Sequence, residues 1–367
     1  MEKIAVIVID TFCAKIVIAN VEQDNYFSIC DMEIEPLTLG LEMDDDHFLK
    51  RTQIAPVMRI LKNFRKICDM YAVAKTIAVA KFVKDSKPMN LYSFFDEIFV
   101  TCGFRFNSLT HEEQNMAIYS GIINSYDIPK AIIICVEQDN IKLVHYNRRT
   151  VLNQAYIPVG PRDLVSMYSP ASANKAESFD KVVKYIKANL SDYEWLKNIT
   201  EEYQVVGTGI FFEDLAKMDR IHTRYPLAKD NGYILTNENI NYILEQIKPL
   251  ELNENKKLKG LNESRADIFA YSVQIIKTIM EYIGKTSATV AVRQLVEGIL
   301  FNNVIPTTVE KPISDCIAFS VMAQTSIYEA DIKKHNEQVY NLSITLFKQL
   351  RVLHKLPRGY LKVLRVA

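Results

Sequence analysis

The sequence has 367 residues, of which 49% are hydrophobic and 24% charged, which is typical of a globular protein with two or three domains. Lysine plus arginine equals aspartate plus glutamate at 44 each, so no overall field attracts nucleic acid or an anionic membrane. The six cysteines and six histidines form no CxxC or HExxH pattern, and no apolar stretch approaches the roughly 20 residues that span a bilayer. We therefore expect a cytoplasmic protein without a zinc motif, a membrane partner or a nucleic-acid partner.

The first third of the chain predicts three strands followed by alternating helices and strands. Short runs of β-branched residues, separated by turn residues, predict strands at 4–9, 14–21 and 26–34. Hydrophobic periodicity predicts the elements that follow: a helix at 48–70, a strand at 76–82, and helices at 90–100 and 112–126.

The next part of the chain repeats this layout. Strands are predicted at 131–135, 141–145 and 151–159, again joined by short polar turns. The elements predicted after them are helices at 163–167 and 178–190, a strand at 203–206, helices at 211–218, 237–247 and 263–283, a strand at 289–292 and a helix at 295–300. From residue 313 onward only helices are predicted. Two such copies indicate an internal duplication and an α/β fold class with a helical C-terminal segment.

Glycine supplies only 11 of the 367 residues, about half the usual share of roughly 7%. Loops that wrap phosphate with backbone N–H groups need glycine, so such loops must be few. The best candidate is Gly207-Thr208-Gly209, which follows a predicted buried strand and precedes a predicted helix. Such a join can aim a helix N-terminus at a ligand, but as a bare pattern it more often serves simply to turn the chain.

Two βββαβα halves are the layout of the actin/hexokinase/Hsp70-like (ribonuclease H-like) fold. Within that fold, the sequence resembles the exopolyphosphatase/guanosine pentaphosphate phosphohydrolase (Ppx/GppA) family over residues 3–355. The segments that carry the resemblance are the opening hairpin at 3–7 and 16–19, the helix end at 118–122, the Gly-Thr-Gly segment at 206–209, the Gly-Leu…Arg-Ala-Asp signature within 260–267 and the Glu-Gly segment at 295–300. The resemblance implies actin-like domains at 1–124 and 125–304, with a phosphate-holding cleft between them, and a helical segment at 305–367.

Matching the residues of the family's cleft to this sequence gives a set of candidate site residues. The first of the family's paired catalytic glutamates matches Glu113, and the second matches Gln114, which would be a vestigial position. The candidate ligand-binding residues are Asp10, Thr11, Lys15, Asp139, Gly207, Thr208, Gly209, Glu297 and Gly298. Lys15, with Lys84 and Arg148-Arg149, could form a basic rim for an acidic ligand, although ordinary solvated charges on hairpins are the favoured interpretation.

Neither phosphate loop of the family keeps its glycines here. The first loop, Asp-Ile-Gly-Ser-Asn-Ser, falls on residues 8–13, and the second, Asp-Ile-Gly-Gly-Gly-Ser-Thr-Glu, falls on residues 135–142. Val8 and Cys135 replace two aspartates, which removes hard oxygen ligands that Mg²⁺ requires. Glu137 and Asp139 replace glycines and would face an anionic ligand. At an effective dielectric of about 20, one such contact at about 4 Å opposes binding by about 4 kcal/mol.

Further losses concern the catalytic chemistry. Gln114 stands where the family has the glutamate that activates water, and a glutamine amide cannot accept a proton at neutral pH. Two arginines of the family fall on Asp85 and Val296. Glu113 is retained, but it also reads as a charge in the first turn of a helix with Thr110 as its N-cap.

From these losses we predict a catalytically impaired family member. It would act as a binding or regulatory protein for a phosphate-rich ligand, such as polyphosphate or a guanosine polyphosphate, or for a partner, and form a homodimer without a cofactor. The alternative is an active exopolyphosphatase or guanosine pentaphosphate phosphohydrolase, in which Asp10, Glu113 and Asp139 form a shifted Mg²⁺ site. A third reading is a purely structural dimer.

The C-terminal helices resemble the start of the family's helical, HD-type third domain. His335 stands where such domains place their first metal histidine, but the sequence ends at Ala367 before any His-Asp pair. Either the native chain continues or this domain has been shortened, and we expect His335 to be a surface residue.

Overall fold

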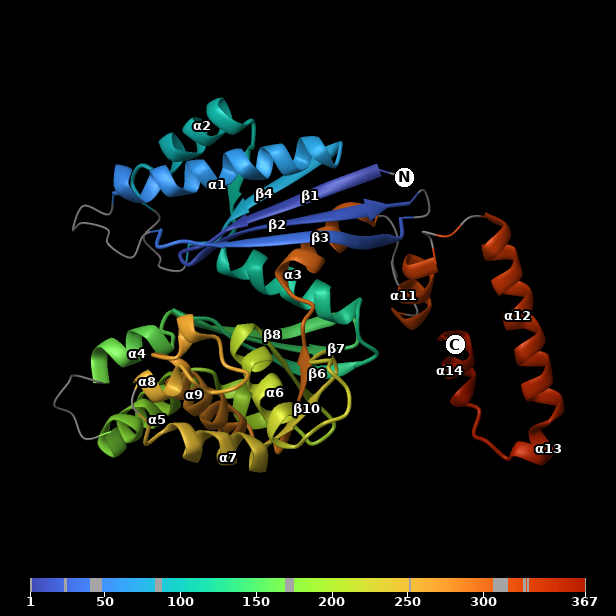
Figure 1. Ribbon diagram of the computed structural model, residues 1–367. Coiled ribbons are helices and arrows are strands. Elements are labelled where there is room, and N and C mark those ends of the chain that lie inside the picture. The colour runs from blue at the N-terminus through green and yellow to red at the C-terminus, as the bar shows by residue number, and fades with distance from the viewer. Residues whose placement is uncertain are drawn as a thin grey trace.

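The computed structural model describes residues 2–22, 25–39, 48–82, 88–168, 175–250, 252–305, 316–325, 328 and 330–366. These residues form two β-sheets, each covered by helices, and a C-terminal group of helices (Figure 1). The predicted α/β class, the duplication and the helical C-terminal segment are thereby confirmed.

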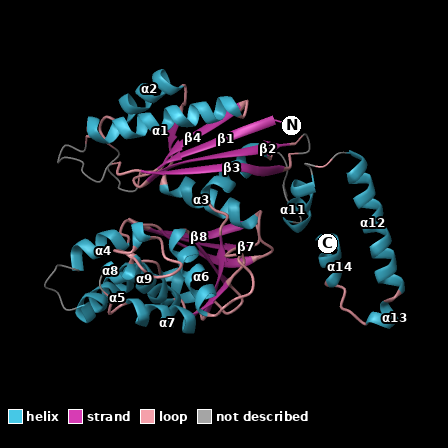
Figure 2. Cartoon of the chain, in the orientation of Figure 1, coloured by secondary structure: helices cyan, strands magenta, loops and turns pink. Residues whose placement is uncertain are grey.

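The first sheet has five strands in the order β3-β2-β1-β4-β5. Its first three strands form an antiparallel meander, β4 lies parallel to β1, and β5 lies parallel to β4. The elements of this half are β1 (Glu2–Ile9), β2 (Cys13–Val21), β3 (Phe27–Pro36), α1 (Arg51–Met70), β4 (Lys75–Ala80), α2 (Leu91–Cys102), β5 (Phe106–Ser108) and α3 (His111–Ile123). Helices α1 and α2 lie on one side of the sheet and α3 on the other (Figure 2).

The second sheet repeats this plan with six strands in the order β10-β11-β9-β6-β7-β8. Here β6, β7 and β8 form the meander, and β9 pairs parallel with β6. The elements of this half are β6 (Lys130–Val136), β7 (Ile141–Asn147), β8 (Thr150–Ile157), α4 (Pro161–Tyr168), α5 (Lys175–Ser191), a 3₁₀ turn (Glu194–Asn198), β9 (Gln204–Thr208), α6 (Ile210–His222), β10 (Ile234–Thr236), α7 (Asn237–Ile247), α8 (Leu252–Asn255), a second 3₁₀ turn (Glu263–Arg265), α9 (Phe269–Tyr282), β11 (Ser287–Ala291) and α10 (Leu295–Val304).

Helices α3 and α10 lie between the two sheets and share one hydrophobic core with both of them. That core joins Val6 of β1 and Ile133 of β6 to Ile118 of α3 and Leu300 of α10, all 3% exposed or less. The two helices approach so closely that a Cβ atom on Gly298 would lie 1.7 Å from the carbonyl oxygen of Ala117. Only glycine permits this crossing, which fixes how the two sheets face each other.

The structure differs from the predicted elements at a few places. Strands β5 and β10 were not predicted because three residues are too few to show an alternating pattern. Gly207 and Thr208 belong to β9 itself and do not form a turn after it. The helix predicted at 263–283 is a 3₁₀ turn followed by α9, which begins at Phe269.

The C-terminal helices are α11 (Cys316–Thr325), α12 (Ala330–Gln349), α13 (Arg351–His354) and α14 (Tyr360–Val366). Phe319 of α11 packs against β3, the turn before it and α10, with ring centroids 5.1 Å from Tyr26, 5.8 Å from Phe27 and 5.6 Å from Phe301. From there α12 and α14 extend away from both sheets (Figure 1). His335 of α12 is exposed, as expected. In the described part of the chain, none of the helices combines the length and hydrophobicity needed to cross a membrane.

Candidate functional site

The turn after β1 and the turn after β6 meet at one lysine. Asp10 is the first residue after β1, and Glu137 is the first residue after β6, so they occupy equivalent positions in the two halves. Lys81, which follows β4, places its Nζ 2.5 Å from Oε1 of Glu137 and 3.5 Å from Oδ2 of Asp10. An ion pair therefore joins the two sheets at the place where the family's two phosphate loops fall.

A second lysine holds the other oxygen of the same carboxylate. Nζ of Lys142, on β7, lies 2.5 Å from Oε2 of Glu137 and donates a hydrogen bond of 2.7 Å to Oδ1 of Asn140. The amide of Asn140 in turn donates to Oε2 of Glu137 at 3.0 Å and to Oδ1 of Asp139 at 3.0 Å. Below, these residues are called the lysine–carboxylate cluster; they are Asp10, Lys81, Glu137, Asp139, Asn140 and Lys142.

The cluster is largely shielded from solvent, since the side chains of Lys142, Lys81 and Glu137 are 1%, 13% and 21% exposed. Burial opposes the charge of Glu137, but Lys142 and Lys81 outweigh it and hold the pKa of this carboxyl below its ordinary value. In the same way, burial would lower the pKa of Lys81, whereas Glu137 and Asp10 hold it well above the ordinary value. The cluster is thus built around a charged Glu137.

The pKa of Asp139 is shifted in the opposite direction from that of Glu137. Burial and the charge of Glu137 raise its pKa to about 6, while Lys81 and the Asn140 amide only partly oppose this. The expectation that Glu137 would repel an anion needs correction, because Lys81 and Lys142 neutralise it. What the structure places at this loop is an internal ion pair, and the carboxylate itself occupies the space between two cations.

The first loop is closed by Asp10. Oδ1 of this residue accepts hydrogen bonds from the backbone N–H groups of Phe12, at 2.7 Å, and Cys13, at 2.6 Å. Thr11 and Lys15 are half-buried beside it. Burial and Asp10 raise the pKa of the Cys13 thiol to about 12, so it is not a reactive thiolate.

Arg162, in the first turn of α4, connects the two loops from the outside. Its Nη2 donates a hydrogen bond of 2.9 Å to Oε1 of Gln138, and its Nη1 lies 3.5 Å from Oδ2 of Asp267. The guanidinium carbon also lies 5.3 Å from the centroid of the Phe12 ring. Arg162 thereby contacts one side chain of each loop, Phe12 of the first and Gln138 of the second.

A further carboxyl lies in the first turn of α6. Oε1 of Glu213 accepts a hydrogen bond of 2.7 Å from the amide of Gln294, which precedes α10. Burial raises the pKa of Glu213 to about 7, with the positive charge of Lys15 opposing the shift and Asp214 adding to it. Lys15 belongs to β2, so the electrostatic effect of its charge on Glu213 acts between the two halves of the molecule.

The candidate catalytic residues have structural partners at the start of α3. Glu113 is exposed, and its Oε2 accepts hydrogen bonds from the backbone N–H of Thr110, at 2.7 Å, and from its hydroxyl, at 3.0 Å. This is a capping box, as the reading of Thr110 as the N-cap predicts. Gln114 is 1% exposed and donates a hydrogen bond of 3.2 Å from its amide to the carbonyl oxygen of Leu109.

The Gly-Thr-Gly segment holds strand β9 and helix α6 together. A Cβ atom on Gly207 would lie 2.2 Å from the ring of Phe212, and the hydroxyl of Thr208 donates to the carbonyl oxygen of Ala291 at 2.8 Å. Gly209 has φ +97°, in the left-handed region that favours glycine, and precedes the first residue of α6. Each residue therefore has a packing reason to be what it is.

The residues of the Glu-Gly segment also have structural roles. Oε2 of Glu297 accepts a hydrogen bond of 2.9 Å from the backbone N–H of Gln294, and Oε1 lies 3.4 Å from Nη1 of Arg293. Gly298 allows α3 and α10 to cross. Of the remaining rim residues, Arg149 donates a hydrogen bond of 2.8 Å to Oδ1 of Asn124, and Lys84 lies outside the described residues, as does Asp85.

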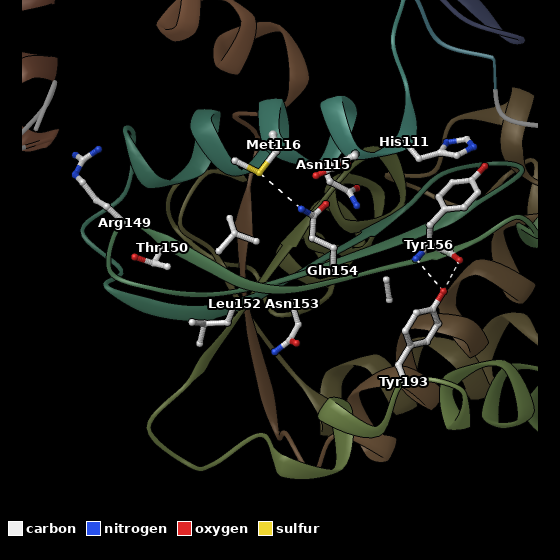
Figure 3. A pocket seen from close by; sticks show the side chains of 13 residues that line it. His111, Asn115, Met116, Arg149, Thr150, Leu152, Asn153, Gln154, Tyr156 and Tyr193 are labelled. Carbon is white, nitrogen blue, oxygen red and sulfur yellow. Dashed lines mark hydrogen bonds between the residues drawn. The ribbon is translucent and has the colours of Figure 1, made fainter. Parts of the chain in front are cut away.

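A separate groove of about 730 Å³ runs between α3 and β8 (Figure 3). His111 stacks on Tyr156 at one end, with ring centroids 3.6 Å apart, and the opposite end reaches Arg149. The hydroxyl of Tyr193 donates to the backbone carbonyl of Tyr156 at 2.8 Å. The groove lies beside the start of α3, and the residues of the lysine–carboxylate cluster are not among those that line it.

A magnesium ion does not fit the residues present. Both oxygens of Glu137 are bound to ammonium groups, and Oδ1 of Asp10 already accepts two backbone hydrogen bonds. Mg²⁺ requires several oxygen ligands at about 2.1 Å. Here the ammonium group of Lys81 lies between the carboxylates of Asp10 and Glu137, where such an ion would have to bind. Within the described ranges, no three histidine, cysteine, aspartate or glutamate side chains come together as a metal site.

Lys81, Lys142 and Glu213 were not predicted as site residues. A signal existed for Lys142, because a lysine within a predicted strand at the second loop stands where the family has a glutamate. Lys81 and Glu213 gave no such signal, since their partners come from distant parts of the chain.

Comparison with known proteins connects this chain to one group. A model of the Ppx/GppA phosphatase family matches residues 17–305. A bifunctional 3-dehydroquinate synthase/phosphatase of Fusobacterium nucleatum is 22% identical in an alignment over 313 residues that covers 81% of this chain and 46% of that protein. The chain thus spans about half the length of this curated relative.

Solved structures agree in fold. A crystal structure of the Ppx/GppA family member of Aquifex aeolicus has a TM-score of 0.71 at 20% identity, over 83% of this chain and 97% of that one. A crystal structure of an exopolyphosphatase from Cytophaga hutchinsonii has a TM-score of 0.74 at 19% identity, over 83% and 98%. At these identities the likeness establishes the duplicated actin-like fold.

Proposed function

Since the chain belongs to the Ppx/GppA phosphatase family, we propose that it is a member that has lost phosphoanhydride hydrolysis and serves as a binding or regulatory protein for a phosphate-rich ligand. The observation that supports this is the Glu137 carboxylate between Lys81 and Lys142. In a phosphohydrolase of this fold, the same loops must leave room for phosphate oxygens and a metal ion.

The state of the catalytic positions supports the same proposal. Hydrolysis needs a base or a water-orienting group, and Gln114 offers a buried amide that is bonded to Leu109. The retained Glu113 is bonded to Thr110 at the start of its own helix. The Gln114 amide cannot accept a proton at neutral pH, and Glu113 serves as part of the capping box of α3.

An assay of phosphate release tests the proposal. The purified chain is incubated with polyphosphate or guanosine pentaphosphate and Mg²⁺ or Mn²⁺, and free phosphate is followed over time. We expect release at the rate of the protein-free control. Steady turnover that scales with the protein concentration overturns the proposal.

The second candidate function is an active exopolyphosphatase or guanosine pentaphosphate phosphohydrolase that uses a relocated carboxylate. The observation that favours it is Glu213, because a carboxyl with a pKa of about 7 is suited to accept a proton at neutral pH. If phosphate is released, Glu213→Gln abolishes the release under this alternative. Glu254→Gln, in the short helix α8, is the matched control.

The ligand and the oligomeric state belong to the same proposal. We expect a polyphosphate or a guanosine polyphosphate as the ligand, and calorimetric titration with each separates binding from a purely structural role. We expect a homodimer, supported by exposed apolar residues of α12, where Val339, Leu342 and Leu346 are 47%, 58% and 54% exposed. Light scattering after gel filtration measures this, and a monomeric mass at micromolar concentration contradicts it.

A further inference from the structure

Two buried ammonium groups converge on one carboxylate at the junction of the sheets. Nζ of Lys81 and Nζ of Lys142 each lie 2.5 Å from a different oxygen of Glu137. The amide of Asn140 adds a third donor, 3.0 Å from Oε2. Buried cations and an amide arranged around an oxyanion are the parts from which proteins build anion sites. Here the anion is one of the chain's own side chains.

We propose that Lys81, Lys142 and Asn140 form an anion-binding site for a phosphate-class oxyanion, and that Glu137 is its internal occupant. The inference rests on the proposed function for the class of ligand, and on the geometry of the cluster for the site. Glu137 satisfies all three donors, so a ligand must compete with a carboxylate of the same chain.

The surroundings limit what the site accepts. Asp10 lies near Lys81, and Asp139 lies beside Asn140, so a second pair of carboxylates faces the space. Burial and Glu137 raise the pKa of Asp139 to about 6, so a fraction of it is protonated near neutral pH and can donate a hydrogen bond to a phosphate oxygen. This favours a single phosphate group, such as the terminal group of a phosphate-rich ligand, over several adjacent phosphates at the same place.

Occupancy of the site is tied to the contact between the sheets. Glu137 follows β6 of the second sheet, whereas Lys81 follows β4 of the first. When an external anion replaces the carboxylate, the direct bond between the sheets becomes a bridge through the ligand. A bound phosphate therefore replaces an internal link by one that exists only while the ligand stays.

Removing the carboxylate tests the site by rescue. In Glu137→Ala the two lysines lose their partner and space opens between them, whereas in Glu137→Gln the lost charge is the same but an isosteric side chain fills the space. We follow the thermal unfolding midpoint with and without inorganic phosphate, with chloride to match ionic strength. At about 10 mM phosphate we expect the midpoint of the alanine variant to rise by about 3 °C or more. The wild type and the glutamine variant are expected to shift by less than about 1 °C.

A second substitution identifies the lysines as the binding groups. Glu137→Ala combined with Lys142→Met removes one cation, and we expect the rise with phosphate to disappear. If the alanine variant does not fold, Glu137→Asp replaces it, because the shorter side chain keeps the charge but loosens its grip on Lys81. Equal shifts in the wild type and the variant, or a rise that persists in the double variant, overturn the site. Phosphate release by the wild type contradicts only the proposed function, so the two failures are distinguishable.

Discussion

Oε1 of Glu137, in the turn after β6, lies 2.5 Å from Nζ of Lys81, which follows β4 in the other sheet. This pair is a direct ion pair between the two halves of the molecule. Each partner has a further ion-pair neighbour, Lys142 for Glu137 and Asp10 for Lys81. This ion pair is therefore part of a row of alternating positive and negative side chains that runs from one sheet to the other.

Breaking this row of ion pairs is expected to destabilise the fold. Lys81→Met leaves Glu137 with one of its two cations in a partly dry environment, and we expect a loss of about 3 kcal/mol in the free energy of unfolding. Lys130→Met is the control, because Lys130 pairs with Glu202 at the same distance of 2.5 Å but with side chains 32% and 55% exposed. The control should lose less than about 1 kcal/mol in urea unfolding. Equal losses for both variants contradict the role assigned to the cluster.

The crossing of α3 and α10 predicts an effect of a single methyl group. In Gly298→Ala the added carbon would lie 1.7 Å from the carbonyl oxygen of Ala117, so the helices must separate. We expect a loss of about 3 kcal/mol or more, although alanine is the better helix former. Gly359→Ala is the control, since no atom lies within 4 Å of its Cβ position. A Gly298→Ala variant as stable as the wild type would show that the helices can shift without loss.

Asp139 predicts a dependence on pH. Its pKa is about 6 in the folded chain, above the ordinary value of 3.8, so the folded state holds a proton that the unfolded state releases. Stability from this group is therefore fully present below pH 3.8 and is lost as the pH rises through about 6, above which it changes no further. The groups that face Asp139 are Glu137 and Asp10, which raise its pKa, and Lys81 and the Asn140 amide, which lower it.

Asp139→Asn removes this titration. We expect the variant to match the wild type near pH 4 and to exceed it by about 1 to 2 kcal/mol at pH 8, measured by chemical unfolding across that range. Asp331→Asn, on the exposed start of α12, should show no such trend. If the difference in stability between Asp139→Asn and the wild type does not change with pH, the pH dependence does not come from Asp139.

Restoring one catalytic residue is not expected to restore hydrolysis. Gln114→Glu returns a carboxyl at the start of α3, but Glu137 and Lys81 still fill the loops where phosphate and metal must bind. We expect phosphate release from polyphosphate to stay at the protein-free rate, with Gln154→Glu in the α3–β8 groove as the control. Activity gained by Gln114→Glu alone would mean that the cluster opens readily.

The fold could be predicted from the sequence because its main signals are local. Runs such as Ile4 to Ile9, and the helical spacing of Ile54, Val57, Leu61 and Phe64, each report their own conformation within a few residues. Strands β5 and β10 escaped prediction because their pairing with neighbouring strands, and not their own pattern, makes them strands.

The site could be predicted only in part, for a related reason. The loss of glycines and of the second glutamate is written in the sequence, and the bond between Glu113 and Thr110 follows from a spacing of three residues. The partners of Glu137 do not follow in this way. Lys81 reaches Glu137 from the other sheet. The sequence alone therefore indicated that the negative charge of Glu137 would repel an anion, and only the fold shows the two lysines beside it.

The anchoring of the C-terminal helices has a mechanical consequence. Phe319 fastens α11 to aromatic side chains of β3 and α10, α14 contacts α11, and α12 contacts α14. A helix of 20 residues such as α12 is about 30 Å long. A tilt of about 5° about one end of such a helix moves its other end by roughly 3 Å, so small changes in how α11 packs on Phe27 and Phe301 should produce larger displacements along α12.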